Sequence, residues 1–300
     1  MSQSRTGPKQ HHYVPKSYLA RFTDPAGFLR IYDRSTGMFR RQRPKVVMRI
    51  NAYYRQSWVP EGVDPNIMET TLGEWLEAEA KNALDRLIER PASLTDDDTA
   101  ILLVYLEVQR IRVPRHAEAA KAALRDAVLR LAPAPVLDAI LSGRSQLTIK
   151  DSARFEGMRA LIGKLGPWFS GMEWEVVTAA DDASFVTTDS PVSFFHPLLP
   201  PPEEAGIALA GTMVFFPLSS RRALVMRHRS RSAMSENLSM EVLPIPEYED
   251  GQIEIIIGAV WDKATVDGFN WRMAMLSSGL IVANDAEVLK RCIQDTGPIS

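Results

Sequence analysis

The sequence predicts an α+β fold in which strands and helices occupy separate parts of the chain. Apolar residues alternate over residues 28–42, recur at helical spacings from about residue 66 to 165, and return to short runs beyond Trp168. Because strands and helices do not alternate, a doubly wound parallel sheet is not expected. We expect an N-terminal basic β-ribbon, a central helical layer and a C-terminal, mainly antiparallel sheet.

A short helix and a hairpin open the chain. Apolar residues between Tyr13 and Phe22 recur at spacings of three and four, and Pro15 suits the first position of a helix. The alternation over residues 28–42 surrounds a turn rich in Asp, Ser and Gly, which predicts a β-hairpin. The basic residues of this ribbon are Arg30, Arg34, Arg40, Arg41, Arg43 and Lys45. They indicate either a solvated strand face or a surface that faces phosphate groups.

Helices are expected in the middle of the chain. An apolar stripe without proline covers Asn66 to Arg90, and Thr95 with Asp98 forms a capping-box pattern. The helix that begins there runs to Val113, where Pro114 kinks or ends it. Further helices are expected over residues 114–131, 136–141 and 150–165.

Short apolar segments separated by turn residues predict the strands of the C-terminal sheet. These segments are residues 174–178, 184–187, 212–216, 223–227 and 253–259. Four prolines between His196 and Glu204 predict a surface loop, and a last helix is expected over 286–294. We treat residues 1–300 as a single domain with sub-layers at 1–60, 61–168 and 169–300.

Composition describes an ordinary globular protein. The 300 residues are 45% hydrophobic and 24% charged, which excludes a collagen-like fibre or a disulfide scaffold. The formal net charge of −2 conceals an asymmetry. Residues 1–55 hold twelve basic and two acidic residues, whereas residues 151–300 hold twelve basic and twenty acidic ones. The basic segment makes an anionic partner plausible, most simply a nucleic acid or a nucleotide.

Cysteine content and hydropathy indicate a cytoplasmic protein without a membrane partner. Cys292 is the one cysteine, so no intrachain disulfide can form, as expected in a reducing compartment. The N-terminus lacks the apolar core of a secretory signal. No apolar run approaches the roughly 20 residues that cross a bilayer.

Highly specific catalytic motifs, such as a Walker loop or HExxH, are absent from the sequence, so candidates come from three polar clusters. The first contains the adjacent His11 and His12, with Lys9, Tyr13 and Lys16 as candidate binding residues. An imidazole can bind metal, act as an acid or assist a phosphate group. The alternative is a pair of histidines that anchors the N-terminus by hydrogen bonds.

The second cluster contains Gln109, Arg112 and His116, which share one helical face if the helix runs through Pro114. A guanidinium beside an amide is a good donor array for a carboxylate or phosphate. The alternative is that Arg112 is buried against an acid of the neighbouring antiparallel helix, for which Glu77 is the candidate.

The third cluster is Thr187-Thr188-Asp189-Ser190-Pro191, directly after an expected strand. An acid at a strand end is a frequent metal ligand or base in enzymes. The alternative is an ordinary turn in which Asp189 bonds to its own backbone.

The order and spacing of these motifs resemble a bacterial family classified as domain of unknown function 4238. The matching positions are His11-His-Tyr-Val-Pro15, Tyr18, Leu19, Phe22, Tyr32, Asp33, Asn51, Tyr53, Glu77, the QxxRxP element with Gln109, Arg112 and Pro114, Thr188-Asp-Ser-Pro-Val192 and Phe216-Pro-Leu-Ser219. This chain departs from the family at Thr188 and Ser190, where relatives tend to have serine before the acid and asparagine after it. The resemblance supplies no activity.

Our leading hypothesis is a metal-dependent hydrolase of a phosphate-containing substrate. In it the catalytic residues are His11, His12, Glu77, Gln109, Arg112 and Asp189, which converge on one pocket. Asp189 and Glu77 hold a divalent metal such as Mg or Mn, or act as base, and Arg112 stabilises developing negative charge. Arg30, Arg40 and Thr188 join the candidate binding residues. The alternative is a non-catalytic nucleic-acid- or protein-binding module in which the same residues form a closed polar network.

Overall fold

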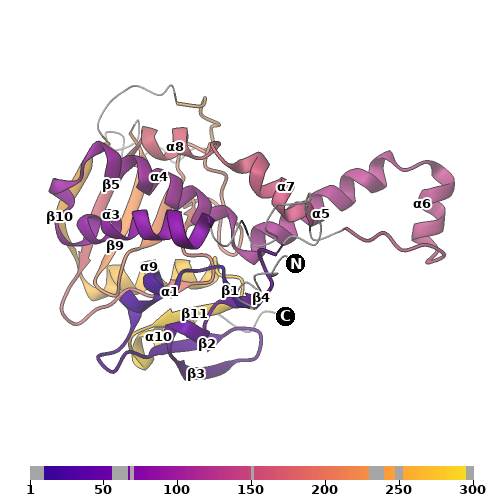
Figure 1. Ribbon diagram of the computed structural model, residues 1–300. Coiled ribbons are helices and arrows are strands. Elements are labelled where there is room, and N and C mark those ends of the chain that lie inside the picture. Colours follow the sequence, from indigo (N-terminus) through magenta and orange to yellow (C-terminus); the bar gives the residue numbers. More distant parts are fainter. Residues whose placement is uncertain are drawn as a thin grey trace, which may run out of the picture.

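The computed structural model describes residues 10–55, 67, 71–149, 152–229, 240–246 and 253–294. The expected α+β class is confirmed (Figure 1). The described helices and strands form three sheets with helices packed around them. No helix in these ranges combines the length and the apolar character that crossing a bilayer requires.

The largest sheet has five strands in the order β10-β5-β9-β8-β7. These strands are β5 (Met172–Ala179), β7 (Ser193–Phe195), β8 (Met213–Pro217), β9 (Arg222–His228) and β10 (Ile255–Trp261). The sheet is mainly antiparallel, as expected, because β10 alone among them runs parallel to its neighbour β5.

Both faces of this sheet are buried, because alternate side chains of each strand enter two apolar clusters. Trp174 and Phe216 pack toward α3 (Glu77–Glu89) and α4 (Asp96–Ile111). Val177 and Phe215 pack toward α9 (Lys263–Met275) and α10 (Ala286–Ile293) on the opposite face. The sheet is therefore the middle layer of the fold (Figure 1).

The basic ribbon is confirmed as a hairpin of β2 (Leu29–Asp33) and β3 (Met38–Gln42). It forms the outer half of a four-stranded sheet in the order β3-β2-β11-β6, completed by β11 (Leu280–Ala283) and β6 (Thr187–Thr188). The C-terminal part of the chain thus supplies the ribbon's partner. Arg34 leaves the ribbon surface and is buried, where its guanidinium donates to the carbonyl groups of Ala274 and Ser277.

A third, two-stranded sheet pairs β1 (Gln10–His12) with β4 (Arg49–Asn51), and its register sets His12 opposite Arg49. The expected first helix is present as α1 (Lys16–Leu19) followed by the 3₁₀ turn η1 (Ala20–Phe22). A second 3₁₀ turn, η2 (Pro44–Val46), connects the ribbon to β4 and packs against α1.

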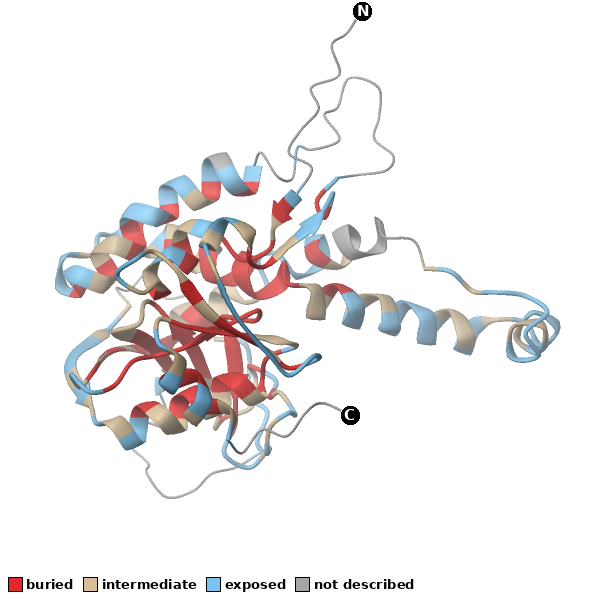
Figure 2. Ribbon diagram, turned by 90° about the horizontal axis from the view of Figure 1, so that it is seen from below, coloured by how far each residue is buried: buried red, intermediate tan, exposed pale blue. Residues whose placement is uncertain are grey.

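Local sequence signals correctly predict where α4 begins and where α5 takes over from it. Thr95 and Asp98 form the expected capping box at the start of α4. Val113 is extended, so α4 ends and α5 (Pro114–Leu131) begins with proline in its first turn. The other described helical segments are η3 (Thr71–Leu76), η4 (Pro91–Ser93), α6 (Ala134–Leu141), α7 (Ser152–Leu161) and α8 (Gly166–Gly171). Figures 1 and 2 show α5 and α6 as an arm that projects from the body, with mostly exposed or half-buried residues.

Several expectations about elements were wrong or incomplete. The strand expected over 184–187 is the two-residue β6, and the helix expected over 150–165 is shorter, with residues 150 and 151 outside the described ranges. The helix α9 was not predicted, because buried Asn270 interrupts its apolar face. Asn270 bonds the backbone of Ser184 and Val186, which explains a polar side chain in that position.

Candidate functional site

The centre of the candidate site is the backbone carbonyl of Tyr13. Arg112 donates to it from Nε at 2.9 Å, and Gln109 donates from Nε2 at 3.3 Å. Arg112 also donates from Nη1 to Glu77 Oε1 at 2.9 Å, which is the buried pair between neighbouring helices considered from the sequence as the alternative to a ligand site. Arg112 and Gln109 are each 1% exposed. This network ties the segment after β1 to α3 and α4 in the interior.

His11 contributes to the same region as an anchor. Its ring is fully buried, and Nδ1 accepts a hydrogen bond from the backbone N–H of Tyr54 at 2.8 Å. The imidazole also stacks on the Tyr54 ring, with 5.8 Å between centroids. The His11 ring is thus hydrogen-bonded at its edge and stacked on its face, and these two contacts fix the position of β1. This supports the interpretation of His11 as an anchor of the N-terminal segment.

His12 points to a different environment, because neighbouring residues of a strand alternate in direction. Burial lowers the pKa of its imidazole, even though a hydrogen bond to the backbone of Lys45 raises it. The positive charges of Arg49, Lys16 and Arg112 lower the pKa further. The ring is therefore neutral near pH 7, and its Nε2 has no hydrogen-bond partner among the described residues.

Asp189, which follows β6, accepts hydrogen bonds from the segment that leads into β11. Its Oδ1 accepts from the backbone N–H of Ser278 at 2.9 Å, and its Oδ2 accepts from Leu280 at 3.1 Å. Burial nevertheless raises the pKa of the carboxyl group to about 6. Thr188 lies beside it, buried, with Oγ1 accepting from the N–H of Ser190. Asp189 thus bonds a distant loop, in contrast to the ordinary turn considered from the sequence.

The two carboxylates expected to share a metal have separate partners. Glu77 pairs with Arg112, whereas Asp189 uses both oxygens on the loop that leads into β11. Among the described residues, no group of three or more His, Cys, Asp and Glu side chains is arranged to hold a metal ion. The part of the chain that the structure describes therefore holds no preassembled metal centre of the kind that carboxylates and imidazoles build.

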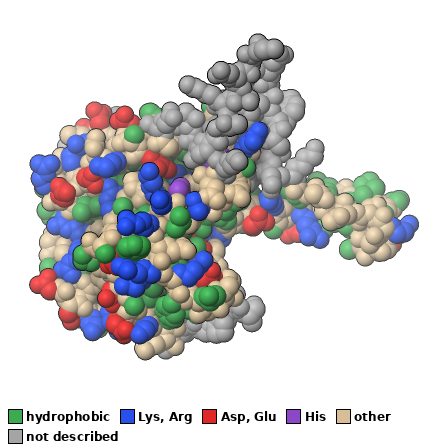
Figure 3. Space-filling model, turned by 60° about the horizontal axis from the view of Figure 1, so that its bottom comes forward, with side chains coloured by type: hydrophobic (Ala, Val, Ile, Leu, Met, Phe, Trp, Pro, Cys, Tyr) green, Lys and Arg blue, Asp and Glu red, His purple; other side chains and the backbone are tan. Residues whose placement is uncertain are grey.

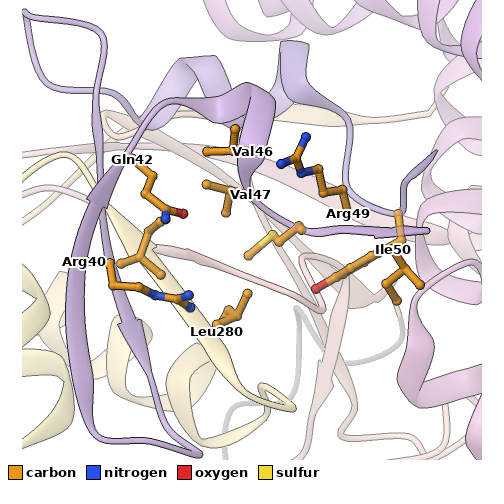
Figure 4. Close-up of a pocket in the computed structure, with 10 residues that line it drawn as sticks. Arg40, Gln42, Val46, Val47, Arg49, Ile50 and Leu280 are labelled. Atoms are coloured by element: carbon orange, nitrogen blue, oxygen red, sulfur yellow. The ribbon is translucent and has the colours of Figure 1, made fainter. Parts of the chain in front are cut away.

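A pocket opens next to this network, on the side of the Tyr13 ring. Its volume is about 210 Å³, and its lining is Tyr13, Ile31, Arg40, Gln42, Val46, Val47, Met48, Arg49, Ile50 and Leu280. Figure 4 shows Arg40 extending toward Leu280, whereas Arg49 lies beside Val46 in another part of the pocket. The pocket thus collects side chains from β3, β4 and β11.

The pocket is electropositive. Arg40 is in an ion pair with Asp33 at 2.8 Å, but Arg49 has no ion pair with a described residue. The lining contains no carboxylate. Burial, together with the charge of Asp189, raises the pKa of the Tyr13 phenol, which stays a neutral donor. Figure 3 shows Lys and Arg side chains gathered on the face that carries the ribbon.

The expected binding residues have different positions. Lys9 lies outside the described residues. Lys16 is exposed at the start of α1, and Arg40 and Tyr13 line the pocket. Arg30 is near Asp24 at 3.7 Å and is absent from the pocket lining.

Of the six expected catalytic residues, the structure joins four into one hydrogen-bonded or electrostatic group: His12, Glu77, Gln109 and Arg112. His11 supports this group from behind, and Asp189 belongs to the loop next to the pocket. Sequence reasoning missed Arg49 and Gln42 as pocket residues. The signal available for Arg49 was the basic run from Arg40 to Arg49, which continues beyond the hairpin.

Sequence reasoning also missed a second buried ionic cluster. The break at Val113 turns His116 away from Arg112 and toward Arg110 and Glu204. Arg110 pairs with Glu204 at 2.5 Å, and both side chains are less than 10% exposed. The proline-rich segment expected to be a surface loop therefore ends in a buried carboxylate.

Comparisons with known proteins give one match. No curated protein and no solved structure matches the chain. A family model described as "Protein of unknown function (DUF4238)" matches residues 10–287, from the first residue of β1 to the first turn of α10. The chain is a member of this DUF4238 family.

Proposed function

We propose that the protein binds a phosphate-containing ligand, a nucleotide or a nucleic acid, in the pocket between β3, β4 and β11. The observation that carries the proposal is the pocket lining, which combines the guanidinium groups of Arg40 and Arg49 with the Gln42 amide and the Tyr13 phenol and has no carboxylate. Each of these groups can donate a hydrogen bond to a phosphate oxygen. Guanidinium groups in particular match the geometry of phosphate.

The size of the pocket suits the phosphate group of a ligand better than a whole ligand. Pockets that enclose drug-sized ligands measure roughly 300–1,000 Å³, whereas this one measures about 210 Å³. A phosphate group therefore occupies the pocket, and the remainder of the ligand lies over the surface of the ribbon.

A binding experiment tests this proposal. A nucleoside monophosphate is titrated calorimetrically against the wild type, Arg40→Ala and Arg49→Ala. A charge-assisted hydrogen bond contributes roughly 1.5–3 kcal/mol, so we expect affinity to fall about tenfold or more in each variant.

Arg144→Ala is the matched control, because Arg144 is an exposed arginine, paired with Asp138, that follows α6 at the end of the arm. Its affinity should equal that of the wild type. Equal affinity in all four proteins, or no binding by the wild type, refutes a phosphate site in this pocket.

Hydrolysis of the bound phosphate ester is a second candidate, favoured by His12. Its imidazole is neutral, and Nε2 has no partner among the described residues while the ring bonds the backbone of Lys45. Such a nitrogen can accept a proton from an attacking water. Because His12 lies across from Arg49, that water would be next to the bound phosphate.

Hydrolysis assays on nucleotides and on RNA and DNA, with Mg, Mn or a chelator, test this second candidate. We expect activity in the wild type, a loss of at least about a hundredfold in His12→Gln, and retained binding of a nucleoside monophosphate in that variant. A difference between the metal and chelator arms shows metal dependence, and Glu77→Gln and Asp189→Asn identify which carboxylate is responsible. Equal rates in wild type and His12→Gln refute a role of His12 as the base.

A further inference from the structure

A second group of cations surrounds His12. Arg49 is its cross-strand neighbour in the β1–β4 pair, and its ring bonds the backbone of Lys45 in η2. Lys16 opens α1, which packs against η2, and its charge acts on the same imidazole. The charges of Arg49 and Lys16 thus act on one histidine, whose ring is also bonded to the backbone of a third basic residue, Lys45.

The positive charge of this cluster is not compensated by the described part of the chain. On the ribbon, Arg30 and Arg41 approach Asp24, and Arg40 approaches Asp33. In contrast, Lys16, Lys45 and Arg49 form no ion pair with any described residue. Among the described residues, the charges that act most strongly on the His12 imidazole, those of Arg49, Lys16 and Arg112, are all positive. Like charges gathered without a counter-charge repel, and a bound anion removes that repulsion.

Unused hydrogen-bonding capacity lies at the base of the same cluster. His12 Nε2 and Arg112 Nη2 are buried, and neither has a hydrogen-bond partner among the described residues. Arg112 acts electrostatically on His12, so the two groups are neighbours. Native proteins pair nearly all buried polar atoms, with protein or with a bound group.

Arg49 connects this cluster to the pocket described above. It lines the pocket, and it is also the cross-strand neighbour of His12. Figure 4 shows Arg49 lying beside Val46 and apart from Arg40, which occupies the part of the pocket near Leu280. Two positively charged locations therefore adjoin each other, with Arg49 between them.

We propose that Lys16, Lys45 and His12 form a second anion subsite beside the Arg40–Arg49 pocket, so that the ligand carries at least two linked phosphate groups. The inference rests on the proposed phosphate site and specifies its ligand class. One phosphate binds in the pocket, the next binds over Lys16 and Lys45, and Arg49 contacts both. Nucleoside diphosphates and polynucleotides share this chemistry.

The experiment compares three ligands at low and moderate salt: a nucleoside monophosphate, the corresponding diphosphate and a short oligonucleotide. For the wild type we expect the diphosphate to bind about tenfold tighter than the monophosphate, since one further charge-assisted contact is worth about that factor. In Lys16→Ala/Lys45→Ala this gain disappears, whereas monophosphate affinity is unchanged. Both lysines are exposed, so the double variant should fold normally.

Two further measurements identify which kind of molecule carries the linked phosphates and whether the second phosphate contacts His12. If the oligonucleotide binds and competes with the diphosphate, a polynucleotide uses both subsites; if the diphosphate alone binds, the ligand is a small polyphosphate. In NMR titrations the pKa of His12 should rise more when the diphosphate is bound than when the monophosphate is bound, because the second phosphate lies directly beside the ring. The double variant Arg125→Ala/Arg130→Ala on α5 is the matched control for total charge.

The outcomes separate the two proposals. If monophosphate and diphosphate bind equally, or if the double lysine variant keeps the gain, the second subsite is wrong while the pocket remains. If the wild type binds monophosphate no better than Arg49→Ala does, the pocket itself is wrong. If no ligand binds, both proposals fail.

Discussion

The stability of the fold should depend on pH through Asp189. Its carboxyl group is 7% exposed, and burial raises its pKa to about 6 from the ordinary 3.8. The folded state therefore binds this proton more tightly than the unfolded chain does. The protonated group contributes stability that is fully present below pH 3.8 and is lost as the pH rises through about 6.

The magnitude follows from the two pKa values. They differ by about 2 units, and one unit corresponds to about 1.4 kcal/mol, so the full change is about 3 kcal/mol. Between about pH 4 and pH 7, most of this change occurs, about 2 kcal/mol. Other carboxyl groups act in the opposite direction, because hydrogen bonds and neighbouring arginines lower the pKa of Asp24 and Asp98. The wild-type curve alone therefore does not isolate Asp189.

The variant Asp189→Asn isolates it, because the amide does not titrate. One N–H of the introduced amide would face a backbone donor, which lowers stability by roughly 1–3 kcal/mol at every pH. Urea unfolding of both proteins from about pH 4 to pH 7 gives the difference in unfolding free energy. We expect the advantage of the wild type to shrink by about 2 kcal/mol as the pH rises. A difference that is constant, or that grows with pH, refutes the argument.

Three further changes test the packing, each by urea unfolding against the wild type. Glu204→Gln removes the carboxylate that pairs with buried Arg110 and should lower the unfolding free energy by about 3–5 kcal/mol; a loss below about 1 kcal/mol contradicts a buried pair. Tyr18→Phe removes the hydroxyl that donates to the Pro217 carbonyl at 2.6 Å and should cost about 1–3 kcal/mol, and an unchanged stability contradicts this. Thr95→Ala removes the cap of α4 and should cost about 1 kcal/mol, whereas Thr95→Ser should retain most of it.

The elements that the sequence predicts best are those with local signals. The Thr95 capping box, Pro114 in the first turn of α5 and the turn of the ribbon depend on residues a few positions apart. The same holds for part of the site. Gln109 and Arg112 lie three positions apart at the end of α4, and the adjacent helix was the natural source of the partner Glu77.

The pocket was beyond sequence reasoning because it depends on contacts between distant segments. Leu280 enters it from β11, a strand that was not predicted, whose neighbour β2 lies about 250 positions earlier in the chain. Arg49 lies on the three-residue strand β4, which is defined by pairing with β1 and not by any periodicity of its own. The role of Asp189 depends equally on the loop before β11, which it holds by two backbone N–H groups.

The place of β11 between β2 and β6 has a consequence for synthesis of the protein. While the ribosome adds the central helices, the N-terminal ribbon has no strand beside it, because residues 280–283 have not yet been made. The edge of β2 at Ile31 and Tyr32 cannot pair with β11 until nearly the whole chain has emerged from the ribosome. An unpaired edge of this kind is where nascent chains associate wrongly, so the edge of β2 opposite β3 is open to such association until β11 has been made.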